Sequence, residues 1–286
     1  LYAAMGPVTI MSGGSAANTI VGAAALGART AFIGKVRDDN LGRGFTHDIR
    51  AIGAHFDTPP AKDGPSTARC FVLVTPDGQR TMNTYLGACQ ALSEADVDEA
   101  TVKASGITYL EGYLWDPPEA KKAFRKAADI AHAAGRRVAL TLSDSFCVDR
   151  YRDEFLQLIR SKTVDIVFAN ESELHALYQT SDFATAVNLL REEATLAAVT
   201  LSEKGSLVVS REATHAVPAF PVERVVDTTG AGDLFAAGFL AGLARGAPLD
   251  HCARLGAMAA AEVIQHVGAR PEANLAALAA ENGLAP

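Results

Sequence analysis

The sequence VERVVDTTGAGDLFAAGFLAGL, residues 222–243, predicts a strand, a tight turn and a helix in succession. Val222, Val225 and Val226 favour a strand, because branched side chains suit a pleated backbone. Residues 227–230, Asp-Thr-Thr-Gly, have the composition of a turn. After the turn, apolar residues recur at the spacing of one helix face.

This arrangement places Gly230, Ala231 and Gly232 at the N-terminus of the helix. The first N–H groups of a helix have no partner inside it, and the helix dipole is positive there. Glycines let an anion approach that backbone closely. Asp233 adds a carboxylate, which would repel a phosphate, so we expect it to remove the proton of a hydroxyl that attacks the phosphate.

Other interpretations of the glycine turn are an ordinary strand-to-helix connection and a dinucleotide-binding turn of the Rossmann type. Two residues disfavour the Rossmann turn. Phe235 occupies the position of the third glycine, and Asp250 precedes another helix instead of ending a strand. The sequence contains no Gly-x4-Gly-Lys-[Ser/Thr] motif, so a P-loop is excluded.

Apolar runs elsewhere alternate with helical patterns, which predicts an α/β/α sandwich with a mostly parallel sheet. A strand-like segment is also expected at Val8–Met11, close to the beginning of the sequence. The other predicted buried strands are Thr30–Gly34, Ile107–Tyr113, Arg137–Leu142, Val164–Ala169, Ala197–Ser202 and Ser206–Ser210.

Composition limits the possible partners. The 286 residues are 49% hydrophobic and 21% charged, which is ample for a large core. The net charge of -7 and the isoelectric point near 5.5 argue against nucleic acid as a partner. The four cysteines show no disulfide or metal spacing, and no apolar run reaches transmembrane length, so we expect a cytoplasmic protein without a membrane partner.

The turn resembles the C-terminal signature of the PfkB family of sugar and nucleoside kinases, Asp-Thr-x-Gly-Ala-Gly-Asp. The family's N-terminal signature, Gly-Gly followed by a small-residue helix with an Asn, is matched by residues 13–18. The resemblance implies the ribokinase-like α/β/α fold with a small β-lid. The whole chain, 1–286, would form one kinase domain with lid elements near 1–11 and 66–90. The strand with which family members begin, carrying an Asp that holds substrate hydroxyls, is absent from this sequence.

The same resemblance implies a set of substrate-binding residues. Thr67–Val74 and Arg80–Tyr85 flank Pro-Asp-Gly and predict a β-hairpin, which forms the lid in this family. Residues 142–146, Leu-Ser-Asp-Ser-Phe, resemble the adenosine-kinase branch, although Ser145 and Thr141 replace its Pro and Asn. The lid face near Tyr85 and Leu86, with Phe146 opposite, could hold a nucleoside base. The expected substrate-binding residues are Gly13, Gly14, Ser15, Asn18, Arg80, Asn83 and Phe146. For the residues of the Gly-Gly segment and its helix, the alternative is a packed small-residue helix without a ligand. For Arg80, the alternative is a solvated arginine on the hairpin.

ATP and Mg²⁺ are the implied cofactors. Asn170 and Glu173 match the family's Asn-x-x-Glu, which organises Mg²⁺ through water, although a plain capping box explains the same pair. The family's nucleotide loop aligns with Thr200, Ser202 and Gly205, with Ser202 replacing a glycine. Thr228 is expected beside the nucleotide, and Asp227 beside a monovalent cation such as K⁺.

The expected function is ATP-dependent phosphorylation of a primary hydroxyl, foremost the 5′-hydroxyl of a nucleoside such as adenosine. The alternatives are a fructokinase- or ribokinase-like sugar kinase and a catalytically silent nucleoside- or sugar-binding protein. The expected assembly is a monomer or a homodimer.

Overall fold

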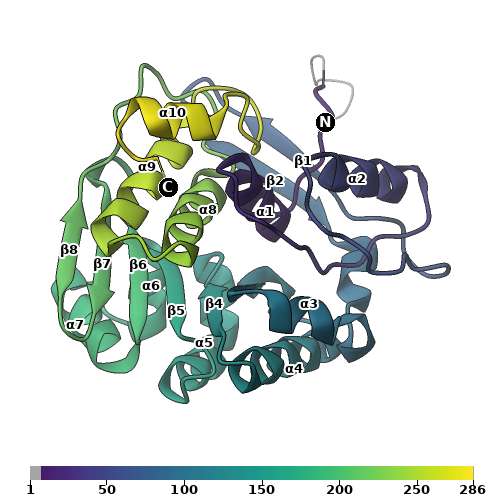
Figure 1. The fold of residues 1–286 in the computed structure, drawn as a ribbon, viewed down its shortest axis with the longest axis horizontal. Helices are drawn as coiled ribbons and strands as arrows, with labels where there is room; N and C mark the ends of the chain where they lie inside the picture. Colours follow the sequence, from purple (N-terminus) through teal and green to yellow (C-terminus); the bar gives the residue numbers. More distant parts are fainter. Residues whose placement is uncertain (1–7, 286) are drawn as a thin grey trace.

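The computed structural model describes residues 8–285, and its centre is a six-stranded sheet in the order β3-β4-β5-β6-β7-β8 (Figure 1). Strands β3 to β6 are parallel. At one edge of the sheet β7 pairs antiparallel with β6, and β8 pairs antiparallel with β7. The strands are β3 (Ile107–Glu111), β4 (Arg137–Thr141), β5 (Ile166–Asn170), β6 (Leu196–Thr200), β7 (Ser206–Ser210) and β8 (Thr214–Val217). The carboxyl ends of the four parallel strands therefore meet at one edge, where α/β proteins bind ligands.

Helices cover both faces of this sheet, as the sandwich prediction requires. The α-helices are α1 (Ser15–Ala25), α2 (Asn40–Ala51), α3 (Glu99–Ala104), α4 (Pro118–Ala133), α5 (Ser145–Arg160), α6 (Glu171–Tyr178), α7 (Phe183–Glu193), α8 (Ala231–Ala244), α9 (Leu249–Val263) and α10 (Leu275–Glu281). Short 3₁₀ helices are η2 (Gly87–Ala91), η3 (Glu94–Asp96), η4 (Gly112–Trp115) and η5 (Ser202–Lys204).

Two hydrophobic cores lie on the opposite faces of the sheet. Successive side chains of a strand point to opposite faces, so Val138 and Leu140 enter the core with α4–α7, while Ala139 enters the core with α8 and α9. In the second core Phe239 is fully buried and packs edge-on against Phe168, with ring centroids 5.5 Å apart. Truncating such a buried phenylalanine to alanine costs about 3–5 kcal/mol, so this core fixes α8 firmly on the sheet.

The predicted β-hairpin is confirmed as β1 (Arg69–Val74) and β2 (Arg80–Tyr85), paired from Arg69↔Tyr85 to Val74↔Arg80. This two-stranded sheet is separate from the central one and lies beside α1 and α2 (Figure 1). Its turn reaches the segment before α8, because the Thr228 N–H donates to the Gly78 carbonyl at 3.2 Å.

Three strand predictions were wrong. The segment 222–226 is irregular, since the main sheet ends at β8 and Val222 and Val225 are exposed instead of packing on it. Thr30–Gly34 makes only an isolated parallel bridge, between Ala31 and His55. Val8–Met11 is irregular and largely exposed, and the part of the expected lid at residues 1–7 lies outside the described residues.

Candidate active site

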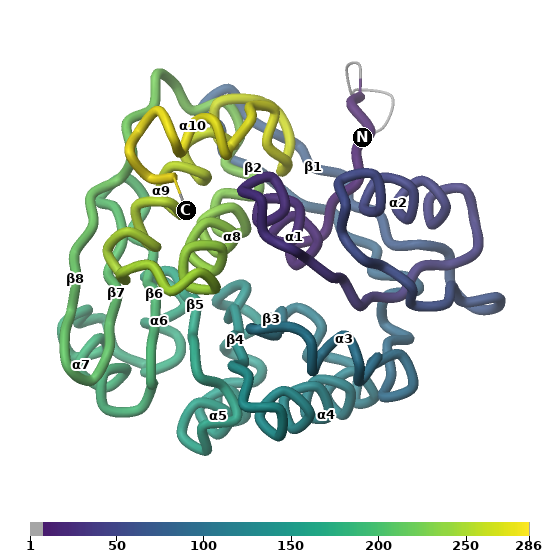
Figure 2. Tube along the Cα trace, viewed as in Figure 1, coloured from purple at the N-terminus to yellow at the C-terminus, as the bar shows by residue number. Residues whose placement is uncertain are grey.

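The two signature segments, from nearly opposite ends of the sequence, lie side by side as α1 and α8 (Figure 2). Ser15 Oγ donates to one carboxylate oxygen of Asp233 at 2.8 Å, and Asn18 Nδ2 donates to the other at 2.9 Å. These two side chains were expected to contact the substrate. Here their donors hold the predicted base in one orientation.

Burial raises the pKa of Asp233, and the hydrogen bonds from Asn18 and Ser15 lower it in part, leaving a net increase. Desolvation disfavours a charged carboxylate, whereas donors aimed at it favour the charged form. The carboxylate is therefore more basic than a solvated aspartate, and the two donors favour its charged form. Both properties suit a group that accepts a proton from a hydroxyl.

The N-terminus of α8 has the geometry expected of an anion site, which stays a prediction. Gly230 is the N-cap with φ of 84°, and a Cβ added to it would lie 2.8 Å from Ala269 Cα, so only glycine fits there without strain. Gly232 has open space around it. Within residues 8–285, the N–H groups of Gly232 and Asp233 have no hydrogen-bond acceptor. These free donors, with the helix dipole behind them, suit a phosphoryl group.

Glu111 is a second carboxylate of this region that the sequence reasoning missed. It ends β3, and its Oε2 accepts a 2.7 Å hydrogen bond from the N–H of Ala16 in the first turn of α1. Burial, with a further contribution from the charge of Asp233, raises the pKa of Glu111 to about 7. An acidic residue ending the buried strand Ile107–Glu111 was the available signal.

The two glycines of the N-terminal signature precede α1. Gly14 is the N-cap of α1, with φ of 100°, and Gly13 before it is exposed.

Arg80 joins the hairpin, the predicted lid, to the segment before α8. Its Nη1 donates to Thr228 Oγ1 at 2.8 Å, and that hydroxyl donates to the Gly78 carbonyl at 3.1 Å. Arg80 also lowers the pKa of Asp233 slightly, which places its charge within range of the base. Arg80 and Thr228, predicted separately, are thus brought together. Asn83 is exposed on β2.

Asp227 ties two loops together. It is buried, and its oxygens accept hydrogen bonds from the backbone N–H and hydroxyl of Thr229, at 2.9 and 2.6 Å, and from the N–H of Gly268 at 2.9 Å. These bonds fix the segment before α8 against the segment after α9. A monovalent cation beside Asp227 stays a prediction.

The residues predicted to bind the nucleotide and the metal lie at the ends of β5 and β6. Asn170 and Glu173 form a reciprocal capping box at the start of α6, and Asn170 pairs with Thr200 across the sheet. Glu173 is buried, and its pKa is raised to about 7. Burial is the main cause, the hydrogen bond from the Asn170 N–H opposes it, and the charge of Asp144 adds to it. The capping role is therefore observed, and it places a buried carboxylate at the carboxyl edge of the sheet.

Ser202, where the family has a glycine, has a left-handed backbone with φ of 53°. The position thus keeps the conformation that favours glycine, although a serine occupies it. Gly205, at the other end of the same loop, has φ of 98°.

The proposed slot for a base is not closed in this structure. Phe146, in the first turn of α5, has 74% of its surface exposed, and Tyr85 is 45% exposed at the end of β2. The ring of Tyr85 is covered instead by the guanidinium of Arg69, 5.2 Å from its centroid. Within residues 8–285, no aromatic contact joins Tyr85 to Phe146.

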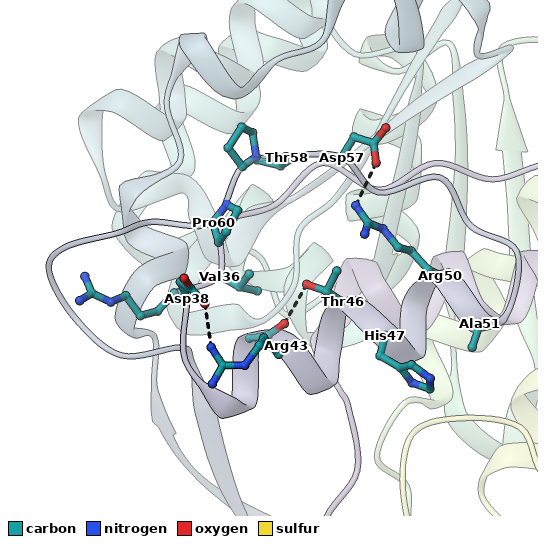
Figure 3. A pocket seen from close by; sticks show the side chains of 13 residues that line it. Val36, Asp38, Arg43, Thr46, His47, Arg50, Ala51, Asp57, Thr58 and Pro60 are labelled. Carbon is teal, nitrogen blue, oxygen red and sulfur yellow. Dashed lines mark hydrogen bonds and ion pairs between the residues drawn. The ribbon is translucent and has the colours of Figure 1, made fainter.

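A groove of about 700 Å³ lies elsewhere, between α2 and residues 57–60 (Figure 3). Two of its cations are already paired, Arg43 with Asp38 and Arg50 with Asp57. It contains none of the predicted site residues, so we do not place the reaction there.

Among the helices of residues 8–285, none combines the length and the apolar character that a membrane span requires.

Comparison with known proteins agrees with this geometry. A family model described as pfkB family carbohydrate kinase matches residues 5–275. The structure of adenosine kinase from Sinorhizobium meliloti is 58% identical, with a TM-score of 0.96 over 98% of this chain and 86% of that one. A probable sugar kinase from Rhizobium etli CFN 42 is 52% identical, with a TM-score of 0.97 over 99% and 86%. Cytidine kinase of Thermococcus kodakarensis is 30% identical over 268 residues, covering 90% of this chain and 89% of its own.

The fold and these similarities define a phosphotransferase of the sugar and nucleoside kinase class. The chain belongs to the PfkB family.

Proposed function

We propose that this chain transfers the γ-phosphoryl group of ATP to a primary hydroxyl, with the 5′-hydroxyl of a nucleoside as the acceptor. The observation that carries the proposal is Asp233, held by Ser15 and Asn18 beside the free N–H groups of Gly232 and of Asp233 itself. A base for a hydroxyl and donors for a phosphoryl group are thus adjacent, as phosphoryl transfer requires.

In this mechanism the acceptor oxygen forms a bond to the γ-phosphorus while the bond from that phosphorus to the β–γ bridging oxygen breaks. ADP leaves with the electron pair of the broken bond. The proton of the acceptor hydroxyl passes to Asp233, whose raised pKa favours its uptake. The free N–H groups at the start of α8 stabilise the negative charge on the moving phosphoryl group.

The residues present fit a hydrated Mg²⁺. This ion keeps most of its waters and is held by one or two carboxylates together with the substrate phosphates. Glu173 supplies a buried carboxylate at the sheet edge, and the charge of Asp144 is close enough to raise its pKa. Glu173 would hold the ion through water, and the ion when bound would neutralise charge on the ATP phosphates.

The lid contributes charge and closure. Arg80 brings a guanidinium over the start of α8 while its bond to Thr228 keeps the turn seated. Closure of this kind excludes water and so limits transfer of the phosphoryl group to water instead of the acceptor.

Two observations favour a nucleoside as the acceptor. The Leu142–Phe146 segment resembles adenosine kinases, and the Sinorhizobium meliloti relative is named adenosine kinase. A sugar kinase remains the alternative, because the Rhizobium etli relative is named a probable sugar kinase. A catalytically silent binding protein is disfavoured by the intact Asp233 and its two donors.

A panel assay of ADP formation tests the proposal, with adenosine, guanosine, inosine, cytidine, ribose and fructose each added to the protein with Mg²⁺ and ATP. We expect turnover with at least one nucleoside at a kcat/KM at least about tenfold above that for either sugar. Turnover confined to fructose or ribose would assign the sugar-kinase function, and ligand binding without turnover would assign the silent protein.

A further inference from the structure

Two connections at the carboxyl edge of the sheet are joined through Tyr113 and Ser143. Tyr113 follows β3 within η4, and Ser143 lies between β4 and α5. The Tyr113 N–H donates to Ser143 Oγ at 3.1 Å, and the phenol hydroxyl donates to the Ser143 carbonyl at 2.9 Å. One tyrosine thus binds both the side chain and the backbone of one serine.

Ser143 needs this support because its backbone is left-handed, with φ of 76°. A residue other than glycine is uncommon in this region, and it persists where its surroundings hold it there. The backbone at Gly112 also packs closely against the segment before Ser143. A Cβ added to Gly112 would lie 2.9 Å from the carbonyl oxygens of Thr141 and Leu142. The Cys147 thiol also donates to the Gly112 carbonyl at 3.1 Å.

The strained serine lies directly before the start of α5. Asp144, the next residue, is the N-cap of α5 and accepts a 2.6 Å hydrogen bond from the Cys147 N–H. The preceding residue, Leu142, donates its N–H to the Phe168 carbonyl at 3.0 Å, which joins this connection to β5. Glu173 follows the end of β5, so the starts of α5 and α6 are neighbours.

The electrostatic environment agrees with a central position for Tyr113. Burial raises its pKa, the carboxylates of Asp144, Glu173 and Asp233 raise it further, and Arg80 lowers it. The phenol therefore lies within range of the proposed base, the proposed metal carboxylate and the lid arginine together. It stays neutral and continues to donate its hydrogen bond throughout the physiological pH range.

We propose that Tyr113 is a positioning residue for the nucleotide and metal end of the site. By holding Ser143 in its left-handed conformation, Tyr113 fixes the start of α5, and with it Asp144, beside Glu173. It acts through Ser143 and needs no contact with ATP. The proposal rests on the proposed kinase function.

The test compares Tyr113→Phe with Tyr151→Phe, a matched control on α5 whose hydroxyl donates to Asp116. Calorimetric titration with ATP and Mg²⁺ needs no acceptor, and steady-state kinetics then separate KM for ATP from KM for the best acceptor. We expect Tyr113→Phe to weaken binding of Mg-ATP about 2- to 12-fold, the effect of one neutral hydrogen bond. The acceptor KM should stay within about twofold, and Tyr151→Phe should change neither quantity.

Ser143→Gly distinguishes positioning from a general loss of packing. Glycine adopts a positive φ without strain, so the double variant Tyr113→Phe/Ser143→Gly should recover part of the binding lost in Tyr113→Phe. Binding of Mg-ATP by Tyr113→Phe at the wild-type level, a change confined to the acceptor KM, or absence of recovery in the double variant would each overturn the positioning role. A wild-type protein that does not bind Mg-ATP would overturn the kinase function as well.

Discussion

Asn18 Nδ2 lies 2.9 Å from Asp233 Oδ2, so an amide near one end of the sequence holds a carboxylate near the other. Ser15 completes the arrangement on the second carboxylate oxygen. The proposed base is therefore oriented by α1 while the proposed anion site is built by α8. Misplacing either helix would separate the base from the phosphoryl group, which is why their packing matters for the proposed chemistry.

Asn18→Ala should shift the pH dependence of the reaction. Removing a donor to the charged form raises the pKa of Asp233 further, so the ionised base is lost at a higher pH. We expect the acidic limb of the kcat/KM profile to move upward, with most of the loss of activity at low pH. Asn188→Ala, on the exposed surface of α7, is the control. An unchanged acidic limb would mean that Asn18 does not support the base.

Glu111→Gln should change how stability depends on pH. The folded-state pKa of Glu111 is raised to about 7 from 4.5, so the folded protein binds more protons than the unfolded chain between these values. Wild-type stability should thus fall as pH rises through this window, and the variant should lose less.

The measurement is the difference in Tm between Glu111→Gln and wild type at pH 5 and at pH 8. The difference should favour the variant more at pH 8. Glu203→Gln, at an exposed glutamate outside the site, is the control. A difference that is the same at both pH values would contradict the buried, charge-coupled position of Glu111.

Thr228→Val should loosen the lid. Valine keeps the shape of threonine but removes the hydroxyl that accepts from Arg80 and donates to Gly78. We expect faster hydrogen exchange in residues 75–80 and more ATP hydrolysis relative to acceptor phosphorylation. Thr84→Val, on the same hairpin but away from α8, should leave both unchanged. Equal exchange in the two variants would show that this contact does not seat the lid.

Glu173→Gln should weaken the dependence on Mg²⁺. Glutamine can keep the capping box, so α6 should stay folded, but a neutral amide holds a hydrated cation less well. We expect the half-saturating Mg²⁺ concentration to rise several-fold. Glu171→Gln, in the same first turn but outside the capping box, is the control. If the titration curve is unchanged in a folded Glu173→Gln protein, this residue is only a cap.

The parallel core and the start of α8 could be predicted because their signals are local. Apolar runs such as Val164–Ala169 report burial directly, and the Gly230–Asp233 sequence fixes a helix start through backbone geometry alone. The strand expected at residues 222–226 failed because valines favour a strand only where a neighbouring strand is available. Here the segment leaves the sheet after Val217.

The partners of the site residues could not be predicted because they depend on contacts between distant segments. Ser15 and Asn18 were expected to face the substrate, and only the packing of α1 on α8 shows that they hold Asp233. Glu111 was missed for the same reason, since its environment depends on the first turn of α1. The aromatic slot at Phe146 stays a prediction.

The most direct measurement of the central claim is single-turnover and steady-state kinase activity of Asp233→Asn with the best acceptor from the panel. Asparagine keeps the shape and the place beside Ser15 and Asn18 but cannot take the proton. General-base loss is worth about 10²–10⁴-fold, so we expect kcat to fall at least that far while calorimetric binding of Mg-ATP persists. Asp250→Asn, in the first turn of the next helix, should keep full activity. Near-wild-type turnover by Asp233→Asn would contradict the assignment of Asp233 as the base.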